Sequence, residues 1–179
     1  MHLRKSLMIT VLTLCAALLA GALLASAQEV GEEPSGEIEF STAATSDPRA
    51  GALALLEQAQ FALSVTATDD SDPDAAAATV QKVINLLEGE SGANYSPAVG
   101  VDGDDTRGAI PYLEELTGRS AADLLTTDLD ALIEANEETP EVLALAHVLL
   151  AQRALLTDGA NALDAAAGHV DQAIALLAN

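Results

Sequence analysis

Two histidines, His147 and His169, lie in adjacent apolar segments separated by the turn signal Asp158-Gly159. If these segments are helices joined at that turn, the two imidazoles lie at nearly the same height, and Asp171 lies at the height of His147. Imidazole and carboxylate groups are ligands for Zn(II), Cu(II) and Ni(II). The pair is therefore a candidate divalent cation site, and the other interpretation is two half-exposed flank residues without a shared role.

A second candidate is the acidic run Asp102-Gly103-Asp104-Asp105. Clustered carboxylates in a glycine-containing loop suit calcium. The run is not an EF-hand, because Arg107 occupies the position that requires glycine and Leu113 the position that requires glutamate. An irregular calcium site completed by Asn94, Glu114 or backbone carbonyls is one interpretation, and a solvated acidic turn is the other.

Sequence patterns for catalysis are absent. The chain has no G-x-S-x-G nucleophile motif, no H-E-x-x-H zinc motif and no phosphate-binding loop. Ala144 and Ala166 precede the two histidines by three positions, so the E-x-x-H pattern of di-iron bundles is missing as well. We expect a protein that is not an enzyme. No cofactor is implied, and the one alternative is a divalent cation.

The charge balance limits the partners. The chain carries 7 Lys and Arg against 28 Asp and Glu, a net charge of −21. Nucleic acid is excluded as a partner, because few residues would neutralise its phosphates. The remaining partners are cations or a protein of the cell envelope, and the oligomeric state stays open.

The N-terminus has the pattern of a secretory signal. Arg4 and Lys5 precede an apolar run, and Ala25-Ser26-Ala27 ends it. This pattern predicts a signal peptide over residues 1–27, followed by a disordered acidic tether over 28–46. We expect a periplasmic or extracellular protein with no transmembrane span in the mature chain, and an uncleaved anchor is the alternative.

Residues 47–179 have helical periodicity and turn signals, and no segment alternates with period two. Asp47-Pro48, Asp72-Pro73 and Thr139-Pro140 are helix starts, and Gly89 and Gly118 are helix stops. We expect a helical hairpin over 47–89, an insert over 90–138 and a second hairpin over 139–179. Within the insert, the sequence predicts a short helix from Ile110 to Thr117 and one continuous helix from Ser120 to about Glu137.

The two hairpins resemble each other in sequence. Leu53-Ala54 and the Ala59–Leu63 segment recur as Leu145-Ala146 and the Ala151–Leu155 segment, and the Val80–Leu87 segment recurs as Val170–Leu177. Similar offsets in the same order indicate an internal repeat. The predicted fold is therefore all-α, an up-down helical bundle of two repeated αα-hairpins with an inserted loop and additional helices.

One stretch resembles a motif of uncharacterised exported bacterial helical-bundle proteins. It is the helix end Val83-Ile84-Asn85-Leu86-Leu87-Glu88-Gly89, followed by Tyr95 and by Asp102-Gly103-Asp104. The resemblance implies an exported helical protein with no known activity. Such proteins often carry a histidine in that helix, where this chain has Thr79. The second hairpin also resembles small periplasmic metal-binding helical bundles, which carry more histidines than this one does.

The sequence thus favours a non-enzymatic extracytoplasmic binding or interaction module. The alternative is a divalent cation-binding protein that uses His147, His169 and Asp171 or the acidic loop.

Overall fold

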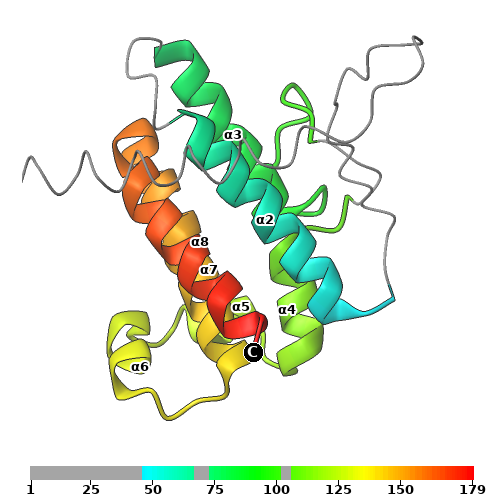
Figure 1. Cartoon of the computed structure of the whole chain (residues 1–179), viewed down its shortest axis with the longest axis vertical. Helices are drawn as coiled ribbons and strands as arrows, with labels where there is room; N and C mark the ends of the chain where they lie inside the picture. Colours follow the sequence, from blue (N-terminus) through cyan, green and yellow to red (C-terminus); the bar gives the residue numbers. More distant parts are fainter. Residues whose placement is uncertain (1–45, 67–72, 102–105) are drawn as a thin grey trace, which may run out of the picture. The chain divides into compact units, whose positions relative to one another are not determined.

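A computed structural model describes residues 46–66, 73–101 and 106–179, and the helices in these ranges belong to one compact unit (Figure 1). No strand occurs in the described ranges, which confirms the predicted all-α class. The helices are α2 (Pro48–Thr66), α3 (Pro73–Glu88), α4 (Ala109–Thr117), α5 (Ala121–Leu124), α6 (Leu129–Ala135), α7 (Pro140–Asp158), the 3₁₀ helix η1 (Gly159–Ala162) and α8 (Leu163–Leu177). The predicted signal peptide and nearly all of the predicted tether lie outside the described residues.

Helices α2, α3 and α7 begin at the prolines that the sequence predicted. The Asp47 carboxylate accepts a hydrogen bond of 3.0 Å from the Arg49 amide, and Thr139 Oγ1 caps α7 by accepting from the Val142 amide at 3.5 Å. A proline follows each cap, where its missing N–H costs no helical hydrogen bond. At the other end of α4, Gly118 adopts the left-handed conformation of a helix C-cap.

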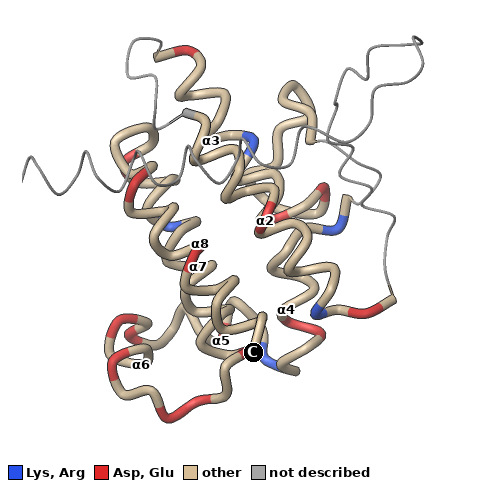
Figure 2. The backbone as a smooth tube through the Cα atoms, in the orientation of Figure 1, with Lys and Arg blue, Asp and Glu red and all other residues tan. Residues whose placement is uncertain are grey.

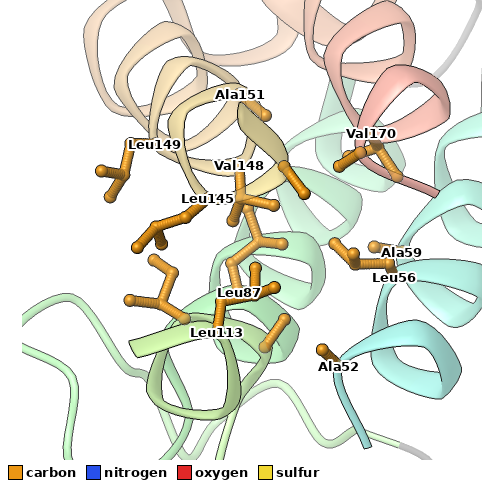
Figure 3. Close-up of a cluster of buried hydrophobic side chains, with 14 of the residues drawn as sticks. Ala52, Leu56, Ala59, Leu87, Leu113, Leu145, Val148, Leu149, Ala151 and Val170 are labelled. Atoms are coloured by element: carbon orange, nitrogen blue, oxygen red, sulfur yellow. The ribbon is translucent and has the colours of Figure 1, made fainter. Parts of the chain in front are cut away.

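The core is built from leucine, valine and alanine side chains of several helices (Figure 3). Leu56 from α2, Leu87 from α3, Leu113 from α4 and Leu149 from α7 meet there, and each is at most 1% exposed. Small residues on facing helices let the backbones approach closely. An added Cβ on Gly51 of α2 would lie 2.6 Å from the buried Tyr112 ring of α4, so these two helices pack at a distance that only glycine allows.

Helix α7 is the central helix of the bundle. It packs against α3, α4, α5, α6 and α8, and most of its residues between Val142 and Ala151 are buried. A helix surrounded in this way is apolar on nearly every side, unlike a surface helix with one apolar stripe. The stretch Pro140–Leu177 is long and apolar enough to cross a membrane by length and composition, but 56% of its most apolar window is buried in the bundle. A core helix meets the same criterion.

The bundle contains two helical hairpins, α2–α3 and α7–α8, which meet along α2 and α8 (Figure 1). Arg49 joins one end of this arrangement, because its guanidinium pairs with Glu141 at the start of α7 and donates to the Leu177 carbonyl oxygen of α8 at 2.9 Å. In the described residues of α3, only the second half is buried. Ala77, in the first half, is exposed.

The predicted continuous helix from Ser120 to Glu137 is wrong. Ser120 caps a helix by accepting from the Asp123 amide at 3.0 Å, but this helix, α5, ends at Leu124. Thr126 and Thr127 bond back to the carbonyl oxygens three residues earlier, and Asp128 then caps a new helix, α6. Threonine hydroxyls compete for helix carbonyls in this way, so the chain breaks where the apolar pattern continues. As a result, Leu125 is 51% exposed.

Candidate functional site

The two predicted histidines face each other across the α7–α8 hairpin. The Nδ1 atoms of His147 and His169 lie 3.1 Å apart, and the ring centroids are separated by 5.4 Å with a tilt of 41° between the planes. Both side chains are half-buried. The two imidazoles therefore lie at the same height, as the turn predicted. They also lie on the facing sides of their helices, which the sequence left open.

At this distance one hydrogen bond joins the two Nδ1 atoms. One imidazole donates through Nδ1–H and the other accepts, so the pair is satisfied when both rings are neutral. Protonation of both rings would place two donors against each other. Burial lowers the pKa of His147, and the charge of His169 lowers it further. The neutral form that binds metal is favoured by the same contact.

Asp171 does not join the pair. It lies two residues after His169 on α8, and side chains two positions apart on a helix point in different directions. Its Oδ1 instead accepts a hydrogen bond of 2.6 Å from Gln60 Nε2 of α2. In the ranges that the structure describes, no group of three or more His, Cys, Asp or Glu side chains is arranged to hold a metal ion.

The carboxylate whose charge reaches the pair comes from α6. Burial lowers the pKa of His169, while the negative charge of Asp130 raises it and the positive charge of Arg153 lowers it. Arg153 and Asp130 form an exposed ion pair of 3.3 Å. Sequence reasoning missed Asp130, because its position depends on the break between α5 and α6, although the Asp128 cap signal was present.

The second predicted site, Asp102, Asp104 and Asp105, lies outside the described residues. The groups expected to complete it are engaged elsewhere. Asn94 donates through its side-chain amide to Glu88 Oε1 at 2.6 Å, and Glu114 Oε1 accepts from the Ala121 amide at 2.6 Å.

The loop after α3 is held instead by two buried polar side chains of that helix. Asn85 donates to the Ser96 and Val99 carbonyl oxygens, both at 2.7 Å, and accepts from the Ser96 amide at 2.9 Å. Glu88 accepts from Asn94 and, at 2.5 Å, from Gln152 Nε2 of α7. The backbone groups of this loop have no strand or helix to bond with. The side chains of Asn85 and Glu88, one helical turn apart, bond to them instead.

The base of the same loop is closed by Gly89 and Gly108. Both have positive φ, and an added Cβ on either would lie within 2.4 Å of the other segment's backbone. The Glu90 amide donates to the Thr106 carbonyl oxygen at 2.8 Å beside them. Asn85, Glu88 and Gly89 therefore anchor the loop. In the sequence this stretch carried only a resemblance, and its role as an anchor was not predicted.

No family model, no curated protein and no solved structure matches this chain. The predicted resemblance to exported bacterial helical proteins stays a prediction.

Proposed function

We propose that this protein is a non-enzymatic, exported binding module whose ligand is a divalent transition-metal ion held between His147 and His169. The observation that carries the proposal is the 3.1 Å separation of the two Nδ1 atoms. With Zn–N bonds of about 2.0–2.1 Å, two nitrogens of a tetrahedral site lie about 3.3–3.4 Å apart. A small opening of the pair is enough to admit the ion.

The chemistry of the pair selects the class of metal. Two imidazole nitrogens suit Zn(II), Cu(II) and Ni(II), whereas calcium prefers oxygen ligands. On binding, both Nδ1 lone pairs turn to the ion and the hydrogens reside on Nε2. With two protein ligands, water fills the other positions, so we expect a micromolar site that exchanges its metal. Asp130 supports the bound cation by its charge.

Calorimetric titration of the purified protein with Zn(II), Cu(II) and Ni(II) tests the proposal. We expect one ion per chain, with affinity lost in His147→Ala and in His169→Ala. Asp171→Asn is the matched control, because this residue faces α2 and its loss should leave the affinity unchanged. Asp130→Asn should weaken binding by less than either histidine change. Helical circular dichroism establishes that each variant is folded.

Absence of binding at micromolar metal, or binding that survives both histidine variants, would overturn the proposal. Loss of affinity in Asp171→Asn would show that the ion sits elsewhere on α8. Export is tested separately by the mass of the protein recovered from a secreting cell, which we expect to begin at Gln28.

A further inference from the structure

A second surface, independent of the histidine pair, lies between α2 and α8. It is an open groove of about 320 Å³. Leu63 and Ala167 supply apolar atoms, Phe61 lies at its side, and Glu57 and Asp171 each bring a carboxylate from one of the two helices. The hydrogen bond from Gln60 to Asp171 ties the helices together beside it and fixes their spacing.

The groove is flanked by exposed apolar surface. Phe61 is 53% exposed, and Val65, one turn further along α2, is 55% exposed. Side chains four positions apart lie on the same side of a helix, so the two extend the apolar lining toward the end of α2. Aromatic and aliphatic side chains in this situation are typical anchors for a partner protein.

The acidic lining of the groove indicates the charge of its occupant. None of the residues that line it is basic, and acidic positions far outnumber basic ones along the described helices (Figure 2). The chain's own residues 28–46 carry five glutamates and no lysine or arginine, and a second copy brings the same net charge of −21. Both are repelled by the groove, whereas a basic partner is attracted to it.

We propose that the α2–α8 groove docks a basic amphipathic helix of another protein. An apolar side chain of that helix packs on Phe61 and Ala167, above the buried Leu63, and flanking lysine or arginine side chains pair with Glu57 and Asp171. The two carboxylates come from different helices, so a helix with cations on both flanks of its apolar stripe pairs with both, which an amine with a single positive charge does not. Such binding is the helix-in-groove mode of peptide recognition.

The test uses a short fluorescent amphipathic peptide of leucine and lysine, titrated with the purified protein at physiological salt. We expect Phe61→Ser and the double variant Glu57→Gln, Asp171→Asn each to weaken binding about tenfold, the size of one lost anchor. The matched controls are Leu125→Ser, an equally exposed leucine on another part of the bundle, and Glu134→Gln, an exposed acid of α6. They should bind like the unaltered protein.

Three outcomes would overturn the docking site. The first is no binding of the peptide to the unaltered protein. The second is equal weakening by groove and control variants, which would show attraction to the acidic surface as a whole. The third is equal affinity for a lysine–serine peptide of the same charge, which would show that the apolar groove contributes nothing. The exposed positions chosen leave the core intact, and circular dichroism verifies it.

Discussion

The hairpins α2–α3 and α7–α8 differ in what their polar residues do, while several of their aligned apolar positions are buried in both. Aligned as the sequence predicts, Ala59 matches Ala151 and Leu63 matches Leu155, and all four are buried. Leu87 and Leu177 match in the same way near the ends of α3 and α8. These shared positions contribute apolar surface to one core, and the internal repeat stays a prediction.

The polar positions are not shared. Asn85 and Glu88, which hold the loop after α3, correspond to Ala175 and Ala178 in the second hairpin. In the other direction, His147 corresponds to the buried Leu55, and His169 corresponds to Thr79. The first hairpin therefore uses its buried polar groups to anchor a loop, and the second places two imidazoles in contact. Packing constrains both copies, whereas each polar site belongs to one of them.

The largest effect is expected from removing the loop anchor of the first hairpin. Asn85→Ala deletes the side chain that joins Ser96 and Val99 to α3 and leaves their backbone groups without that partner. The free energy of unfolding should fall by about 2–3 kcal/mol. Urea denaturation measures the loss, and limited proteolysis should show faster cleavage in residues 90–101. Asn161→Ala, at an exposed asparagine of η1, is the control, and an equal loss there would contradict the anchor.

A smaller effect of opposite sign is expected at Gln58. This side chain is 5% exposed, and among the described residues neither its amide nitrogen nor its oxygen has a hydrogen-bond partner. The matching residue of the second hairpin is Leu150, which is buried. Gln58→Leu should raise the free energy of unfolding by about 1–2 kcal/mol, because it removes an unsatisfied buried amide. A lower free energy of unfolding in chemical denaturation would contradict this, because it would show that the amide has a partner such as a buried water.

The smallest effect is a pH dependence confined to the second hairpin. The lowered pKa values of His147 and His169 mean that the unfolded chain binds more protons below about pH 6.5, so stability is highest above that value and declines as the pH falls. Asp130 opposes this decline at His169 and Arg153 strengthens it. Replacing the pair by the residues of the first hairpin, His147→Leu with His169→Thr, should flatten the slope of stability between about pH 7.5 and pH 5.5. An unchanged slope would show that other titrating groups cause the pH dependence of stability.

Local signals predicted the helix ends well. Asp47-Pro48 and Thr139-Pro140 start helices, and Gly89 and Gly118 end them, because capping depends on side chains within a few residues of the terminus. The same reasoning failed at residues 120–137. Leucine periodicity continues through Thr126 and Thr127, but the hydroxyls of these residues bond back to the chain and end α5.

The candidate site was likewise predicted only in part. The turn at Asp158-Gly159 was enough to place His147 and His169 at one height, since helix geometry fixes the rise per residue. It was not enough to place Asp171, whose direction depends on α2 and on Gln60 lying beside α8. Asp130 approaches the pair from α6, ten residues before α7 begins, and no spacing rule connects the two.

By itself, then, the sequence determined the helical class, the capped ends and the register of the α7–α8 hairpin, because each follows from interactions between residues that are near in the chain. Only the tertiary structure decided that the imidazoles meet at 3.1 Å, that Asp171 faces α2 and that Glu88 joins the loop to α7. These contacts depend on how separate helices rotate about their axes, and that rotation is set by the packing of the whole core.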